Sequence, residues 1–363
     1  MRTALLLVLA TASPDEGRGP IPPTPRVATA QDPDPSSARL EDATRLAIER
    51  GLTFLATEQA KTVGGGFPRD GGEYAPIGVT ALGALAYMAA GNVPGRGPHG
   101  KELMRALDYL LEKTDLGPSS RTRGFVRSGD AFVNGRMHAH GFATLALAEA
   151  YGMAPQRLER VGEALEAAVR LIERSQGAEG GWQYQPFAVA QHEGSVTIAL
   201  VQALRAARNS GVTIDTDVVR RAEDYVVRLQ KDDGTFRYQL DDESSTTALT
   251  AAAITTLNMA GRYDDRVITS AIDAVWSGLL LQEEENAPLQ WPYYQRLYVA
   301  QAFWQLSDTS HFERWYASER EVLLKTQNDD GSWSNGTWGD CYATAVNCLV
   351  LALPQGLLPV FQR

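Results

Sequence analysis

The chain has 363 residues, of which 44% are hydrophobic and 21% are charged. That balance is typical of a folded globular protein and excludes a disordered or fibrous chain. There are 34 Lys and Arg against 44 Asp and Glu, which gives a net charge of −10. Nucleic acid is therefore not expected as a partner, because binding to phosphates needs a basic field. The only two cysteines, Cys341 and Cys348, exclude a disulfide framework and a four-cysteine zinc module.

The N-terminal residues 1–12 look like a secretory signal peptide. Arg2 is followed by an apolar run over 4–10 and by Ala10-Thr11-Ala12, which has the small-x-small form of a cleavage site. A disordered tail is the alternative. Residues 13–40 are rich in Pro, Asp, Ser and Thr, which predicts an extended linker. No later stretch reaches the ~20 apolar residues of a membrane span. We therefore expect a secreted or periplasmic protein whose folded domain covers 41–363.

From residue 41 onward the sequence repeats with a period of about 55 residues. Each unit has the same order: a helix with one apolar face, a turn that joins a small residue to an aromatic one, and then a more apolar helix. The six aromatic positions are Phe67, Phe125, Trp182, Phe236, Trp291 and Trp333.

The two helices of a unit differ in how their apolar residues are distributed. Residues 158–172 carry apolar side chains in one stripe with Arg and Glu opposite, whereas residues 195–207 are apolar on nearly every side. The same contrast separates 218–230 from 245–259. It predicts two layers, with polar-faced helices outside and apolar helices inside. Because no unit resembles a polar cap, we expect closure into a ring rather than an open solenoid.

Three of the turns follow the pattern Q-x3-G-x-W, one of them with Phe in place of Trp. The pattern resembles the repeat of the prenyltransferase and squalene-cyclase superfamily, over roughly residues 41–353. This resemblance implies an all-α fold, an α/α-toroid of six outer and six inner helices. The glycines are expected at positive φ, and the glutamine amide is expected to satisfy backbone groups at a helix end. The motif residues are Gln176, Gly180, Trp182, Gln230, Gly234, Phe236, Gln327, Gly331 and Trp333.

Two further segments, 137–147 and 357–363, are similar to segments of exported, single-domain bacterial proteins of this superfamily. This closer likeness implies the fold and leaves the activity open.

In a toroid the first turns of the inner helices share one mouth of the central cavity. Polar residues at helix starts often cap helices. Six helix dipoles with their positive ends at one mouth nevertheless make it the expected ligand site. The stretch Trp291-Pro292-Tyr293-Tyr294 adds aromatic rings that could stack sugars or line an isoprenoid channel, although such rings more often belong to the core. The cavity candidates are His138, His140, His192, Glu193, Thr247, Tyr294, Tyr298, Trp304, Cys341 and Tyr342.

Protonation chemistry leaves only weak catalytic candidates. The resemblance implies an acid motif D-x-D-D-T-A for the cyclases of the superfamily. Residues 241–248 keep the final Thr-Ala pair in register, but Glu243, Ser245 and Thr246 stand where aspartates belong. The candidates that remain are Asp241, Asp242, Glu243 and Asp340.

Metal chemistry is not predicted. The resemblance implies a D-x-C zinc motif for protein prenyltransferases, and Asp340-Cys341 lacks the intervening residue. A site built from His138, His140 and His192 is an alternative, but residues two apart on a helix point to different faces. No metal and no cofactor is expected.

These patterns lead to an exported toroid that binds a hydrophobic, isoprenoid-like ligand or a peptide in its cavity. A terpenoid cyclase or prenyltransferase-like enzyme is the first alternative. A glycan-processing toroid is the second, since such enzymes use paired carboxylates across a cleft. The sequence does not indicate which polar side chains meet in the cavity.

Overall fold

The computed structural model describes residues 35–68, 76–128, 136–154, 158–259, 261–262, 265–285, 289, 291–334 and 338–362. The expected signal peptide and most of the linker lie outside this range. The first helix already begins at Pro35, before the boundary expected at residue 41. The described residues form no β-strand and twelve α-helices: α1 (Pro35–Ala60), α2 (Ile77–Ala89), α3 (Gly100–Glu112), α4 (Arg136–Met153), α5 (Glu159–Ser175), α6 (Gly194–Asn209), α7 (Thr216–Arg228), α8 (Thr247–Met259), α9 (Arg266–Glu285), α10 (Pro292–Trp304), α11 (Ser310–Thr326) and α12 (Asp340–Ala352).

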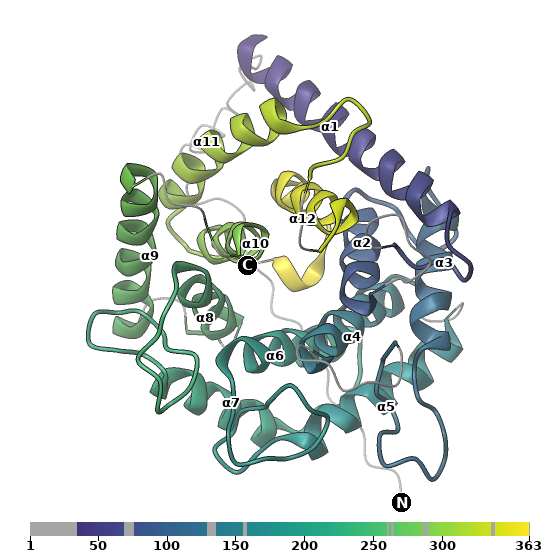
Figure 1. Cartoon of the computed structure of the whole chain (residues 1–363), viewed down its shortest axis with the longest axis vertical. Helices are drawn as coiled ribbons and strands as arrows, with labels where there is room; N and C mark the ends of the chain where they lie inside the picture. The colour runs from purple at the N-terminus through teal and green to yellow at the C-terminus, as the bar shows by residue number, and fades with distance from the viewer. Residues whose placement is uncertain are drawn as a thin grey trace, which may run out of the picture.

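The helices form two concentric rings (Figure 1). The even-numbered helices stand inside, and each packs against the next one along the chain. The last of them, α12, packs against the first, α2, while α11 packs against α1 in the outer ring. The predicted α/α-toroid is therefore confirmed, and an open solenoid is excluded.

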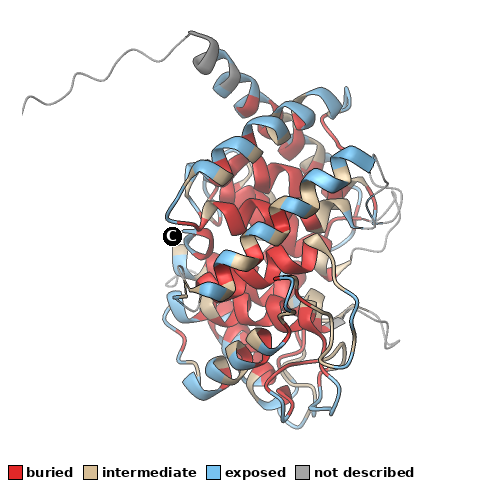
Figure 2. Ribbon diagram, turned by 90° about the vertical axis from the view of Figure 1, so that its left-hand side faces the viewer, coloured by how far each residue is buried: buried red, intermediate tan, exposed pale blue. Residues whose placement is uncertain are grey.

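Burial follows the two layers (Figure 2). The inner helix α2 buries every residue from Val79 to Ala89. The outer helix α7, in contrast, buries only Val218, Ala222, Tyr225 and Val226, which form one stripe. The contrast in apolar pattern between the helices of a unit thus reflects how much of each helix circumference is covered. No described helix combines the length and the apolar character needed to cross a membrane.

A glutamine ties each of four corners between neighbouring outer helices. Nε2 of Gln176 donates to the carbonyl oxygens of Gly180 (2.7 Å) and Val218 (2.8 Å), the latter in α7. Gln327 likewise bonds Gly331 (2.9 Å) and Ala47 of α1 (2.8 Å), so the same contact closes the ring. Gln230 and Gln59 make the corresponding pairs with Gly234 and Val267, and with Gly65 and Glu102.

The corner glycines allow the next outer helix to approach closely. Gly180 has φ of 97° and Gly331 has φ of 91°. A Cβ atom on Gly180 would lie 2.1 Å from the carbonyl oxygen of Arg221. At Gly331 it would lie 2.4 Å from that of Arg50. Glycine is required there both for the backbone conformation and for space.

Residues 353–362, the closing segment, cover the end of the inner ring at which α12 finishes. The segment contains two 3₁₀ turns, Leu353–Gln355 and Pro359–Phe361, and the second packs against α6. Val360 is completely buried, and its N–H donates to Oε1 of Glu149 in α4 (3.2 Å). The opposite end of the ring, where the inner helices begin, carries a cavity.

Candidate functional site

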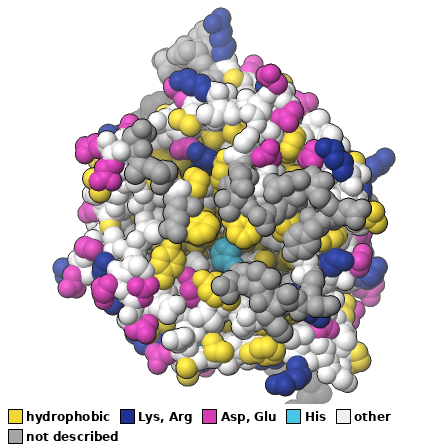
Figure 3. Space-filling model, in the orientation of Figure 1, with side chains coloured by type: hydrophobic (Ala, Val, Ile, Leu, Met, Phe, Trp, Pro, Cys, Tyr) yellow, Lys and Arg dark blue, Asp and Glu magenta, His cyan; other side chains and the backbone are white. Residues whose placement is uncertain are grey.

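A cavity of about 930 Å³ lies at the N-terminal ends of the inner helices. Every inner helix contributes to its wall, from its first turns or from the residues just before it. Hydrophobic side chains surround a histidine ring near the centre of this face (Figure 3). The aromatic lining residues are Phe142, Tyr184, Tyr238, Trp291, Tyr294, Trp338 and Tyr342.

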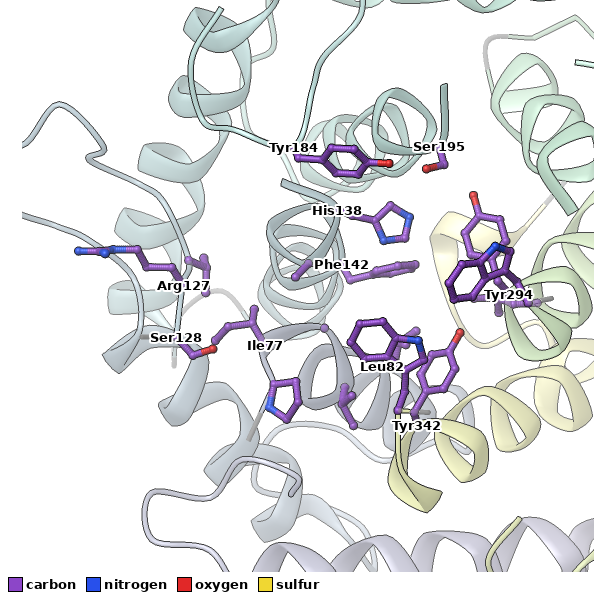
Figure 4. Close-up of a pocket in the computed structure, with 18 of the residues that line it drawn as sticks. Ile77, Leu82, Arg127, Ser128, His138, Phe142, Tyr184, Ser195, Tyr294 and Tyr342 are labelled. Atoms are coloured by element: carbon purple, nitrogen blue, oxygen red, sulfur yellow. The ribbon is translucent and has the colours of Figure 1, made fainter. Parts of the chain in front are cut away.

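His138 and Phe142 project from one face of α4 into the cavity (Figure 4). Their rings meet edge to face with centroids 5.1 Å apart, and Tyr294 lies 5.8 Å from the imidazole. Nε2 of His138 is buried without a hydrogen-bond partner among the described residues. Burial lowers the pKa of His138 to about 4, because the cationic form cannot be hydrated there. The imidazole is therefore neutral at pH 7.

Ser195 supplies a hydroxyl to the wall next to His138. Its Oγ donates to Oε2 of Glu193 (2.7 Å), and the same oxygen accepts the N–H of Val196 (2.8 Å). Glu193 is thus the N-cap of α6 and lies behind the wall, only 2% exposed. Burial raises the pKa of Glu193, against the opposing effect of these hydrogen bonds. In Figure 4 the hydroxyl groups of Tyr184 and Ser195 point toward one another above His138.

Three of the ten predicted cavity residues line the cavity: His138, Tyr294 and Tyr342. Tyr298 is buried next to Tyr294, with ring centroids 4.6 Å apart, and its hydroxyl donates to Gln202 (3.3 Å). Glu193 reaches the lining only through Ser195.

His140 lies in the core, outside the lining. Its Nδ1 accepts the N–H of Val126 (3.2 Å). In four other repeats a threonine on the inner helix accepts the equivalent bond from the turn aromatic: Thr80, Thr197, Thr250 and Thr344. Burial lowers the pKa of His140 to about 3. The histidine therefore takes the place of a structural threonine.

The other four predicted residues also lie outside the lining. The imidazole of His192 contacts the carbonyl oxygen of Val189 (2.9 Å) and packs against Tyr225. Thr247 accepts a hydrogen bond from Gln282 (3.1 Å). Trp304 packs against Phe312 at the far end of α10, and Cys341 is buried. The three histidines considered as a zinc site do not converge, and the described residues hold no group of three metal-ligating side chains.

The four catalytic candidates do not enter the cavity either. Asp241 is exposed, Asp242 accepts hydrogen bonds from Ser244, and Glu243 forms an ion pair with Arg237 (3.0 Å). Asp340 is half-buried in the first turn of α12. The described lining contains no Asp or Glu at all.

Two tyrosines of the lining escaped the sequence analysis. Tyr184 and Tyr238 each follow the turn aromatic of their repeat, Trp182 or Phe236, by two residues. In the second unit the lining residues Arg127 and Ser128 follow the turn aromatic Phe125 by two and three residues. The tyrosine two residues beyond the turn aromatic, present in both of these units, was the signal that could have located them.

No protein-family model matches the chain, and a search of curated proteins also finds no match. Solved structures do match. An α-1,6-mannanase of glycoside hydrolase family 76 from Salegentibacter sp. HEL1_6 superposes with a TM-score of 0.62 at 10% identity, over 88% of this chain and 99% of that one. A type II terpene cyclase variant from Scytonema, in complex with its substrate geranylgeranyl dihydroxybenzoate, gives 0.54 at 17% identity, over 87% and 99%.

An unsaturated glucuronyl hydrolase specific for heparin gives a TM-score of 0.59 at 12% identity, over 86% of this chain and 96% of that one. The chain therefore shares the α/α-toroid fold of both glycosidases and terpene cyclases. At these sequence identities the likeness concerns the fold alone. The choice between functions therefore depends on which residues line the cavity.

Proposed function

We propose that the cavity binds a small ligand with an elongated apolar body, such as an isoprenoid, and does not perform acid catalysis on it. The observation that carries this proposal is the composition of the wall. Aromatic rings and the aliphatic side chains of Ile77, Val79, Leu82 and Leu297 surround the space, and the described lining offers no carboxyl group. Apolar surface of this kind favours the transfer of a hydrocarbon from water.

Both enzyme alternatives need a carboxyl group that the described lining lacks. Cyclisation started by protonation needs a buried carboxylic acid, and glycoside hydrolysis needs two carboxyl groups across the bond to be cleaved. The neutral His138 does not replace them, because an imidazole with a pKa of about 4 is unprotonated at pH 7. The Scytonema cyclase, solved with a geranylgeranyl compound, supports the proposal to the extent that this fold can hold a polyprenyl chain.

The test begins with the purified protein. Mass spectrometry of its organic and peptide extracts is expected to reveal a co-purifying apolar compound. Added polyprenyl compounds should raise the thermal midpoint and change the fluorescence of Trp291 and Trp338, which line the cavity. The variant Ala139→Phe fills part of the space and should abolish both effects. The same change at Ala317, exposed on the outer helix α11, is the matched control. Absence of any bound or stabilising apolar compound would refute the proposal.

A second candidate is glycan binding, which one observation favours. Hydroxyl groups stand beside the aromatic rings, and tyrosine and tryptophan rings can stack on sugars. An inactive variant of the Salegentibacter mannanase was solved with α-1,6-mannotriose. Saturable binding of that trisaccharide, with no response to polyprenyl compounds, would replace the proposal by this one. The lining hydroxyl residues are Ser128, Ser195, Ser244, Ser245 and Thr246.

Export remains a separate proposal that rests on residues 1–12 alone. N-terminal sequencing of the protein recovered from its native cell envelope or medium is the direct test. A mature chain that starts just after residue 12 would support it, and an uncleaved cytoplasmic chain would refute it.

A further inference from the structure

We infer that the ligand carries an uncharged hydroxyl group, which is seated in a polar corner of the cavity formed by Tyr184, Ser195 and His138. This inference rests on the proposed function and specifies the chemical class of the ligand. The three residues lie together on one side of the cavity, whereas Ile77, Leu82 and Phe142 present only hydrocarbon (Figure 4). The cavity is thus amphipathic, and its ligand is expected to be amphipathic as well.

Ser195 is prepared to accept a hydrogen bond rather than to donate one. Its proton is directed to Oε2 of Glu193 at 2.7 Å, so the lone pairs of Oγ are left for the cavity. Oε2 also accepts the N–H of Val196. If Glu193 is neutral, its proton therefore belongs on Oε1, and the hydrogen bond from Ser195 keeps its direction. The Oγ atom of Ser195 can therefore accept a hydrogen bond from the ligand whether Glu193 is neutral or ionised.

The neighbouring groups complete the match to an alcohol. Tyr184 carries an O–H donor that points toward Ser195, and the neutral imidazole of His138 can donate or accept according to its tautomer. An alcohol can donate its proton to Ser195 while its oxygen accepts from Tyr184 or His138. An ether or a hydrocarbon cannot make the first of these bonds.

The electrostatics of the corner disfavour anionic head groups. The only Lys or Arg of the described lining is Arg127, and its side chain extends away from the cavity (Figure 4). Glu193 lies directly behind the corner, so a carboxylate or diphosphate would lose hydration beside a buried acid without gaining a cation. The carboxyl group of Glu193 accepts hydrogen bonds from the hydroxyl of Ser195 and the N–H of Val196, both in its own helix. It is therefore not available for a direct ion pair with a ligand amine.

A matched series of polyprenyl compounds tests the inference on the wild-type protein. The probes are geranylgeraniol, its methyl ether, geranylgeranoic acid, geranylgeranyl diphosphate and geranylgeranylamine, and the readout is the dissociation constant from tryptophan fluorescence. We expect the alcohol to bind about tenfold more tightly than the ether, the effect of one hydrogen bond. The three charged compounds should bind more weakly than the alcohol.

Serine variants locate the contact. Ser195→Ala should weaken binding of the alcohol about tenfold and leave that of the ether unchanged. Ser195→Thr keeps a hydroxyl and should restore binding of the alcohol. Ser210→Ala is the matched control: it lies at the other end of α6, where its hydroxyl bonds the carbonyl oxygen of Ala207 (2.8 Å), and it should bind both probes as the wild type does.

The outcomes separate the two proposals. If alcohol and ether bind equally, or if a charged compound binds most tightly, the inference is wrong while the proposed function stands. If no compound of the series binds, the proposed function itself fails. Should Ser195→Ala not fold, as judged by its thermal midpoint, the comparison of alcohol and ether on the wild type still decides.

Discussion

At the scale of single residues, burial controls the acid–base behaviour of His138. Its pKa in the folded protein is about 4, against about 6.5 for an unperturbed histidine. Between these two values the folded state binds fewer protons than the unfolded state. The contribution of His138 to stability is therefore fully present above pH 6.5 and is lost as the pH falls toward 4.

The lowered pKa of His138 can be measured directly. In a ¹H–¹³C NMR titration the ring signals of His138 should not move between pH 8 and pH 5.5, and the midpoint should lie at about 4. His138 in the urea-unfolded protein supplies the reference and should titrate at about 6.5. A native midpoint close to the reference would mean that water reaches the imidazole, and the apolar character assigned to this part of the cavity would then be wrong.

Two glycines allow the cost of backbone strain to be measured separately from the cost of close packing. Gly180 and Gly211 have almost the same φ, 97° and 98°. A Cβ atom at Gly180 would meet the carbonyl oxygen of Arg221 at 2.1 Å, whereas at Gly211 no atom lies within 4 Å. Gly211→Ala should lower the free energy of unfolding by about 1 kcal/mol, because alanine disfavours the left-handed conformation. Gly180→Ala should lower it by at least about 2 kcal/mol more, because the added Cβ atom also has no space. Urea denaturation of both variants measures the difference, and equal losses would contradict the close approach.

At the scale of elements, the corner glutamines link each turn to the next outer helix. Gln176 is buried and serves two carbonyl oxygens, while Gln230 makes the same contacts but is half-buried. Gln176→Leu should lower the unfolding free energy by about 1–3 kcal/mol, because two buried carbonyl groups lose the amide that donates to them. Gln230→Leu should cost less, because water can reach its site. Denaturant midpoints test this order, and a larger loss at Gln230 would reverse the argument.

A feature of the fold could be predicted from the sequence where it is determined by residues close together in the chain. The alternation of helix types and the corner at Gln176 were readable, since a helix face and a turn are each set by nearby residues. Gln59 was missed because five residues rather than three separate it from Gly65, although it makes the same two bonds. His140 was misplaced because it occupies a position held by threonine in four other repeats.

The lining could be predicted only in part, for a physical reason. Whether a residue near the start of an inner helix faces the cavity depends on the rotation of that helix about its axis, which its neighbours determine. His138 and His140 are two residues apart, and only the first faces the cavity. Tyr184 lies before its helix, where its direction follows from the path of the turn.

At the scale of the whole molecule, two contacts between distant parts of the chain complete the toroid. Gln327 bonds Ala47, which closes the outer ring. Val360 of the closing segment bonds Glu149, which fixes that segment over the end of the inner ring. The second contact involves an acid whose pKa burial raises to about 7. Glu149 should therefore make its own contribution to the pH dependence of stability.

The sign of that dependence is the opposite of the histidine effect. An unfolded glutamate has a pKa of about 4.3, so between that value and 7 the folded state binds more protons than the unfolded state. The contribution of neutral Glu149 is fully present below pH 4 and is lost as the pH rises through 7.

Glu149→Gln keeps a carbonyl acceptor for Val360 and cannot ionise. Relative to the wild type, this variant should gain up to about 3 kcal/mol of stability between pH 5 and pH 8. Glu166→Gln, on the exposed face of α5, controls for the loss of one charge. Urea denaturation at several pH values measures the gain, and parallel curves for Glu149→Gln and the wild type would show that Glu149 is already hydrated in the folded protein.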